Sequence, residues 1–368
     1  MSIPFKHIQA RGSYRELGRA VGEGAREEVR ASLDFFRENL SAMTGGRLSF
    51  KQAERRALAY AECARRWLPR QVEELEGLAE GAGLPFSQLM VPNCGEEFTC
   101  GGAVDGLPPA PASAAARQGD HCTAVAVSRG GRRVVGHNMD WYVVDAVNSV
   151  LFDFTVPDGT RVMGIAGAPY LLMLGVSSHG VASVSNSVHC ADDRVGVPNT
   201  FVRRSTLEAA TLEEARARGL LAARARGTNH FLADAAGRLW DLETSATASA
   251  FEDHTEAGFM IHTNHYVAPA MAPFEGAAHA ESRHRLAEAE RMLGEGLARG
   301  DDPVELVAAV LRTHGPGHEA AVCGHPRPAE SPAEQGMTVS SMICELDERR
   351  IHVCAGPPCE NPYQTFAM

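Results

Sequence analysis

The sequence contains very little lysine. Among its 368 residues only Lys6 and Lys51 are lysines, and every other basic side chain apart from histidine is an arginine. Both lysines lie near the start of the chain, so we expect neither a Schiff-base lysine nor a phosphate-loop lysine deep in the fold. The net charge of −11, without a basic stripe, argues against binding to nucleic acid or to an anionic membrane surface.

Long hydrophobic runs are also missing from the sequence. The first residues include no apolar stretch of signal-peptide length, and no run approaches the length of a membrane span. We therefore expect a cytoplasmic protein that does not enter a membrane. Hydrophobic residues make up 44% and charged residues 22%, values that are ordinary for a globular protein with a buried core.

The nine cysteines show no pairing pattern. Their number is odd, and neither a CxxC pair nor a zinc-type spacing of cysteine and histidine occurs. We therefore expect reduced thiols, no metal and no bound cofactor. The chemistry then rests on a single cysteine.

The residue pattern of the sequence changes near residue 100. Apolar residues at three- and four-residue steps predict helices from about residue 13 to residue 80, with Gly81 as a stop. Residues 101–119 are rich in glycine, proline, alanine and serine, which indicates an exposed linker.

The second part of the chain alternates between strand and helix patterns. The expected strands are 123–128, 132–136, 150–156, 161–165, 170–174, 181–185, 231–233, 239–243 and 258–262, with a final hairpin of 337–346 and 350–354. The expected helices are 206–221, split near residue 211, then 281–297 and 303–313. This order indicates a layered α+β fold.

Cys122 stands where the linker meets the first strand, in Asp120-His121-Cys122-Thr123. If the bond between His121 and Cys122 breaks, Cys122 carries a thiol and a free α-amine. That amine has a reference pKa of about 7.7–8.0 and can accept the thiol proton, so the nucleophile needs no separate histidine. A structural cysteine at a strand edge is the alternative interpretation.

Two later segments can complete such a site. In Gly136-His137-Asn138-Met139-Asp140, the aspartate can hold the α-amine and His137 can line the sulfur. In His262-Thr263-Asn264-His265, the amide of Asn264 can donate to an oxyanion. Asn186 is a third candidate amide.

Together these segments resemble the acyl-CoA:6-aminopenicillanic acid (isopenicillin N) acyltransferase family of autoproteolytic N-terminal-nucleophile hydrolases. The resemblance rests on the segments around Cys122, Asp140 and Asn264, on the helical segment 75–84, and on 356–362 near the end. It implies an α+β fold of four αββα layers and self-cleavage between His121 and Cys122. The two products, 1–121 and 122–368, would stay associated as one domain.

The resemblance also implies roles for individual residues. Cys122 is the expected nucleophile, Asp140 the amine-binding carboxylate and Asn264 the oxyanion donor. The acyl group would pass from a small-molecule donor, such as an acyl-CoA or another thioester, to an amine or to water. The expected substrate-binding residues are His137, Asn138, Trp141, Asn186 and His265.

The sequence departs from the family at one position. An arginine often follows a cysteine in this part of the family, whereas here Gly324 follows Cys323, and His325 or Arg327 are the candidates to fill the space. This departure keeps open a processed but catalytically weak binding protein. A metal-dependent hydrolase that uses His262, His265 and either His279 or His284 is a further alternative.

Overall fold

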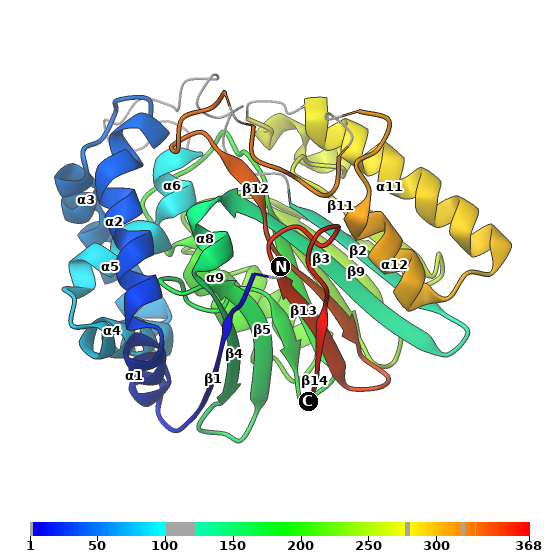
Figure 1. The fold of residues 1–368 in the computed structure, drawn as a ribbon, viewed down its shortest axis with the longest axis horizontal. Helices are drawn as coiled ribbons and strands as arrows, with labels where there is room; N and C mark the ends of the chain where they lie inside the picture. The colour runs from blue at the N-terminus through cyan, green and yellow to red at the C-terminus, as the bar shows by residue number, and fades with distance from the viewer. Residues whose placement is uncertain (1–2, 101–121, 277–279, 318–320, 328) are drawn as a thin grey trace.

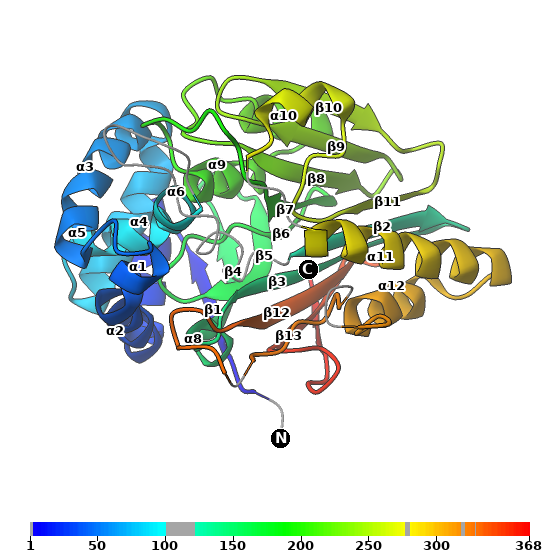
Figure 2. The same cartoon turned by 90° about the horizontal axis from the view of Figure 1, so that it is seen from above.

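The computed structural model describes residues 3–100, 122–276, 280–317, 321–327 and 329–368. Two β-sheets lie against each other between helices (Figures 1 and 2). The first sheet has eight strands in the order β1 (Lys6–Arg11), β4 (Ser149–Thr155), β5 (Arg161–Gly167), β6 (Gly175–Ser177), β7 (Val181–Ser187), β8 (Thr228–Asp234), β9 (Leu239–Thr244) and β10 (Ser249–Asp253). The second has six, in the order β11 (Phe259–His262), β2 (Thr123–Arg129), β3 (Arg132–Tyr142), β12 (Gly336–Glu345), β13 (Arg350–Ala355) and β14 (Gln364–Ala367).

Helices form the two outer layers. Beside the eight-stranded sheet lie α1 (Tyr14–Gly24), α2 (Arg26–Met43), α3 (Phe50–Trp67), α4 (Pro69–Ala82), α5 (Phe86–Asn93), α6 (Gly95–Thr99), α9 (Asn199–Thr206) and α10 (Leu212–Gly219). The six-stranded sheet is covered by α11 (Ala280–Arg299) and α12 (Pro303–Arg312), and the short α8 (Val144–Val147) and a 3-10 helix at Pro269–Phe274 lie in connections. The expected α+β fold with four αββα layers is therefore confirmed.

Local signals explain where several helices begin. Ser13 and Ser49 each cap a helix and form a capping box with Glu16 and Gln52, respectively. Asp302 caps α12, and Pro303 occupies its first turn. In the described part of the chain no helix is both long and apolar enough to span a membrane.

The β2–β3 hairpin sets the position of Cys122. Gly130 and Gly131 make its turn with φ of 59° and 84°, and two positive φ angles suit a tight hairpin that matches the twist of its strands. The register pairs Thr123 with Asn138, so β3 returns to the start of β2. Cys122 therefore lies beside Met139 and Asp140.

The structure corrects several predicted elements. Residues 170–174 are not a strand, because Asn93 hydrogen bonds with the carbonyl of Pro169 and the N–H of Leu171 and so occupies this backbone. The helix expected to start at residue 206 instead ends there, and Gly81 lies inside α4, which stops at Gly83. The strands β1, β6, β10 and β14 were not predicted. The predicted linker at 101–119 lies outside the described residues.

Candidate active site

Cys122 directly precedes β2 and lines a small cavity between the two sheets. Its side chain is 7% exposed, and Sγ lies 3.9 Å from the carbonyl oxygen of Asp140. His121, on the other side of the predicted cleavage bond, lies outside the described residues. Cleavage at this bond therefore remains a prediction.

The cavity measures about 20 Å³, roughly the space of one water molecule. One side is apolar and the other is polar. Besides Cys122 and Asp140, the lining residues are Met139, Trp141, Met173 and Leu174 on the apolar side and Glu96, Ser185, Ser187 and Arg203 on the polar side.

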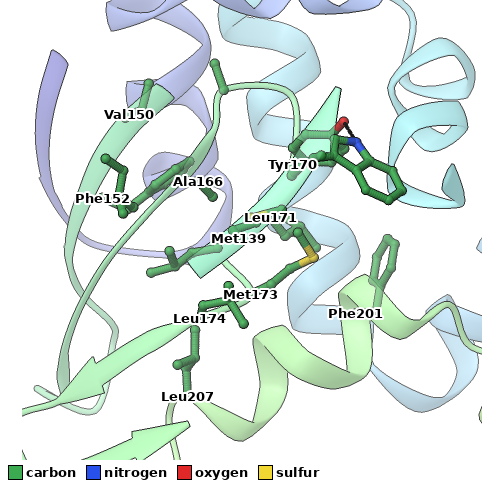
Figure 3. Packing of buried hydrophobic residues seen from close by; sticks show 14 of the residues in the cluster. Met139, Val150, Phe152, Ala166, Tyr170, Leu171, Met173, Leu174, Phe201 and Leu207 are labelled. Carbon is green, nitrogen blue, oxygen red and sulfur yellow. Dashed lines mark hydrogen bonds between the residues drawn. The ribbon is translucent and has the colours of Figure 1, made fainter. Parts of the chain in front are cut away.

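Trp141 is the one predicted substrate-binding residue among those that line the cavity. Its indole N–H donates to the hydroxyl of Tyr170 at 2.9 Å, and Tyr170 donates in turn to Asp145 at 2.9 Å. Figure 3 shows Leu171 next to Tyr170, and Met139, Met173 and Leu174 in the same apolar cluster, with Phe201 nearby. The indole is thus held by a hydrogen bond while its ring packs in the core.

Asp140 lies on β3, opposite Thr338 of β12. The hydroxyl of Thr338 donates to Oδ1 of Asp140 at 2.7 Å, whereas Oδ2 of Asp140 accepts no hydrogen bond from any described residue. Burial raises the pKa of Asp140 to about 7, against the lowering effects of the Thr338 hydrogen bond and the positive charge of Arg285. A buried carboxylate with an unused oxygen favours a nearby cation.

Asn264 follows β11, which pairs with β2 so that His262 lies opposite Ala124. Asn264 lies two residues beyond the last paired residue of β11 and is not among the residues that line the cavity. Its Nδ2 donates to the carbonyl of Ser187 at 3.0 Å. Because an amide nitrogen carries two hydrogens, this bond leaves one hydrogen for a further acceptor.

The buried Arg285 was not predicted from the sequence. It extends from α11 and donates to Oδ1 of Asn264 at 2.6 Å, and its charge lowers the pKa of Asp140. Its position could have been found, because Ser282, Arg285 and Ala289 recur at helical spacing on the buried face of α11. A buried cation therefore lies beside two of the predicted site residues.

Gly324 packs directly against Asp140. A Cβ atom at this position would lie 2.8 Å from Oδ2 of the aspartate. Neither residue proposed to fill the space does so: His325 contacts His314 and Cys359, and the half-exposed Arg327 lies near two glutamates. The prediction for His325 and Arg327 was therefore wrong, and Arg285 is the cation that acts on Asp140.

Glu96 and Arg203 form the polar end of the cavity and were also missed. The guanidinium of Arg203 donates to both carboxylate oxygens of Glu96, which also accept from Ser187 and Asn199. Glu96 belongs to α6, before the predicted cleavage point, and Arg203 belongs to α9, after it. Nothing in the local sequence pairs these two residues, because 106 residues separate them.

Two predicted substrate-binding residues, His137 and Asn186, belong to a buried network. His137 contacts the carbonyl of Ser185 at 3.0 Å and Oδ1 of Asn186 at 3.2 Å, and burial lowers its pKa to about 4. Asn186 in turn donates to the carbonyl of His262 at 3.0 Å. Neither His137 nor Asn186 lines the cavity, so the structure does not bring them to the sulfur.

Asn138 and His265 lie outside the cavity as well. Asn138 donates to two backbone carbonyls, of Leu311 and Val322, and accepts from Ser341. His265 contacts the hydroxyl of Ser282 at 2.7 Å. Both side chains are buried and anchor the segments around the site, so their prediction as substrate-binding residues is not supported by this geometry.

The histidines of the alternative metal site do not converge. The ring of His262 is buried between Oε1 of Glu243 at 2.8 Å and the carbonyl of Thr263 at 2.6 Å, whereas His265 contacts Ser282. His284 is exposed on α11 and His279 lies outside the described residues. The geometry gives no support to a metal-dependent hydrolase built on His262 and His265.

Comparison with known proteins identifies the family of the chain. A family model described as acyl-coenzyme A:6-aminopenicillanic acid acyl-transferase matches residues 127–313. The acyl-coenzyme A:6-aminopenicillanic-acid-acyltransferase 40 kDa form of Emericella nidulans is 25% identical over 369 residues, which cover 98% of this chain and 95% of that protein.

Two solved structures show weaker similarity. Penicillin V acylase from Agrobacterium tumefaciens has a TM-score of 0.44 and 13% identity, over 64% of this chain and 82% of its own. A variant of conjugated bile acid hydrolase from Clostridium perfringens has a TM-score of 0.45 and 10% identity, over 67% of this chain and 97% of its own.

Proposed function

Because this chain belongs to the acyl-coenzyme A:6-aminopenicillanic acid acyl-transferase family, we propose that it cleaves itself before Cys122 and then transfers acyl groups through that cysteine. The observation that carries this proposal is the position of Cys122 between two neighbouring strands of one sheet. Cys122 directly precedes β2, Asp140 lies on β3, which pairs with β2 on one side, and Asn264 follows β11, which pairs with β2 on the other.

Self-cleavage would begin with attack of the Cys122 thiol on the carbonyl carbon of His121. The C–N bond breaks as the C–S bond forms, and the amide nitrogen takes up the thiol proton to become the α-amine of Cys122. Water then hydrolyses the thioester, which releases the carboxyl group of His121 and restores the thiol.

The new α-amine gives Asp140 a partner. Protonated, it would supply the positive charge that the unused Oδ2 of Asp140 favours, and the aspartate would hold it beside the thiol. Deprotonated, it would accept the thiol proton when Cys122 attacks the acyl donor. The same amine would then protonate the leaving group.

The tetrahedral intermediate needs a donor for its oxyanion. The free hydrogen on Nδ2 of Asn264 is our candidate, and Arg285 holds the amide oriented by binding its Oδ1. One such donor typically contributes about 3–4 kcal/mol to the transition state.

The acyl group would lie along Met139, Trp141, Met173 and Leu174. The cavity of about 20 Å³ is too small for an acyl chain, so these side chains must shift to admit one. Methionine suits this role because its unbranched side chain has several low-energy conformations. The acceptor, an amine or water, would approach from the polar side, near Arg203.

Intact mass under denaturing conditions tests the proposal. We expect the wild type to give two fragments, 1–121 and 122–368, and the Cys122→Ala variant to give one full-length chain. Cys344→Ala is the matched control, since burial raises the pKa of that thiol to about 12 and leaves it inert; it should be cut like the wild type.

The acyl-enzyme is tested on the same samples. After incubation with a medium-chain acyl-coenzyme A, the 122–368 fragment should gain the mass of one acyl group, and 6-aminopenicillanic acid or another amine should remove it. A cut protein that is never acylated would favour a binding protein. An active chain that stays uncut would contradict the whole mechanism.

A further inference from the structure

Four metal-binding side chains meet in a second cluster, away from the cavity. His314, Cys323, His325 and Cys359 place one ligand atom each within 4.8 Å of all the others. Nε2 of His314 lies 3.0 Å from Nε2 of His325, and the sulfurs of Cys323 and Cys359 are 3.5 Å apart. Nε2 of His325 lies 3.2 Å and 3.9 Å from the sulfurs of Cys359 and Cys323, respectively.

Four of the six spacings between these ligand atoms, from 3.0 to 3.9 Å, are close to the edges of a small tetrahedron, and all six are within 4.8 Å. Zinc bonds of about 2.3 Å to sulfur and 2.0–2.1 Å to nitrogen put neighbouring ligand atoms roughly 3.3–3.8 Å apart in tetrahedral geometry. Two thiolates with two imidazoles are a ligand set that favours zinc among the divalent metals of the cell. The cluster needs only small shifts to enclose an ion.

The backbone brings the ligands together from three places. The N–H groups of Val322 and Cys323 both donate to the carbonyl of Thr313, which closes the loop between His314 and Cys323. Cys359 lies in the turn after β13, and Oε1 of the next residue, Glu360, is 3.6 Å from Nδ1 of His325. A carboxylate on the far nitrogen is the usual neighbour of a zinc-bound histidine.

We propose that His314, Cys323, His325 and Cys359 bind one zinc ion as a structural site. Binding releases the two thiol protons, and the ligands then close the coordination shell with no open position for substrate. This inference goes against our expectation of no metal, which rested on the lack of a short ligand motif.

Hydrogen bonds connect the proposed zinc site to Asp140. Gly324, between two of the ligands, donates its N–H to the hydroxyl of Thr338 at 2.9 Å and accepts from the N–H of Thr338 at 3.1 Å. That hydroxyl donates to Oδ1 of Asp140. A zinc ion that holds Cys323 and His325 would therefore fix the backbone behind the carboxylate, so its ligands are positioning residues.

Metal content of the full-length protein tests the proposal. Purified under reducing conditions and dialysed against zinc-free buffer, the wild type should keep one zinc ion per chain by elemental analysis. Cobalt loaded in its place should give visible absorption bands of a tetrahedral ion and a sulfur-to-cobalt charge-transfer band.

Variants distinguish the loss of zinc binding from a general effect on folding. Cys359→Ser and His314→Asn change exposed ligands, so both should fold yet bind zinc about 100-fold or more weakly than the wild type. Cys63→Ser, outside the cluster, should bind like the wild type. Hydrogen exchange at residues 322–325 and 338 should speed up when a chelator removes the ion.

Two results would overturn the proposal. The reduced wild type could fail to bind zinc or cobalt, or Cys323 and Cys359 could prove to form a disulfide, seen as a mass lower by about 2 Da. Only the link to Asp140 rests on the proposed function. Cys122→Ala should still bind zinc, so a failure of the nucleophile and a failure of the metal site are distinguishable.

Discussion

Burial makes several cysteines of this protein unreactive by raising the pKa of their thiols. The thiols of Cys344 and Cys354 have pKa values raised to about 12 by burial, and burial also raises the pKa of Cys94. Such thiols are inert, because the thiolate is the reactive form. Cys122 differs through its place, since it lines the cavity together with Asp140 and its Sγ lies 3.9 Å from the carbonyl oxygen of that residue.

We expect the buried His137 to lower the free energy of unfolding of this protein in acid. Burial lowers its pKa from 6.5 to about 4, so between these values the unfolded chain binds a proton that the folded chain does not. Its contribution to stability is therefore complete above pH 6.5 and is lost as the pH falls toward 4. We expect the free energy of unfolding to fall less steeply over this window in His137→Gln than in the wild type.

Urea unfolding at several pH values between 4 and 7 measures this slope. Glutamine can keep a hydrogen bond to the carbonyl of Ser185, so a lower overall stability of the variant does not affect the comparison of slopes. Equal slopes would mean that His137 is protonated in the folded protein, contrary to its neutral position in the buried network.

At the scale of elements, α1 and α4 cross at unusually short range. A Cβ atom at Gly18 would lie 1.8 Å from the carbonyl oxygen of Glu74, and one at Gly77 would lie 2.0 Å from that of Arg15. Such a Cβ atom would collide with backbone atoms, which cannot move aside as a flexible side chain can. The glycines in these helices therefore serve packing, which explains why Gly81 does not end α4.

Gly77→Ala should thus destabilise the protein by about 1–3 kcal/mol or more, because the two helices must move apart. Gly294→Ala is the control: it also lies inside a helix, nothing lies within 4 Å of its Cβ, and alanine is the better helix former. Thermal or urea unfolding should show opposite signs for the two variants. Equal effects would argue against close contact of α1 and α4.

At the scale of the whole molecule, ion pairs join the two predicted products. The fully buried Arg204 on α9 contacts Glu74 on α4 at 2.9 Å and Glu208 at 2.7 Å. Tyr14 on α1 donates to Glu208 at 2.9 Å. Together with the Glu96–Arg203 pair, the contacts of Arg204 with Glu74 and of Tyr14 with Glu208 cross the predicted cleavage point, so we expect 1–121 and 122–368 to remain together.

Arg204→Ala should cost about 3–5 kcal/mol, because it leaves two buried carboxylates without their cation. Arg291→Ala removes an exposed arginine that pairs with Glu288 and Glu295, and it should leave the unfolding midpoint unchanged within error. After cleavage the wild-type fragments should co-elute in size-exclusion chromatography, whereas those of Arg204→Ala should separate at lower denaturant. Co-elution up to the same denaturant concentration would contradict this role.

The sequence predicted most of the elements and gave Cys122, Asp140 and Asn264 as candidate site residues. Alternation and helical spacing depend on neighbours in the chain, so β2, α11, α12 and the final hairpin were found within a few residues, whereas β3 extends six residues beyond its predicted end. The prediction of a strand at 170–174 was wrong, because Asn93, which is distant in the sequence, forms hydrogen bonds with the backbone of this segment. The fold class followed from the resemblance and from the order of elements.

By itself, the sequence singled out Cys122, Asp140 and Asn264 as candidates, because Cys122 directly precedes a predicted strand and Asp140 and Asn264 each follow one closely. Only the tertiary structure decided what surrounds them. Arg285, the Glu96–Arg203 pair and the four ligands of the proposed zinc site come together from distant segments, and side-chain direction at a distance is set by packing rather than by local spacing. The same packing turned His137, Asn138, Asn186 and His265 away from the cavity.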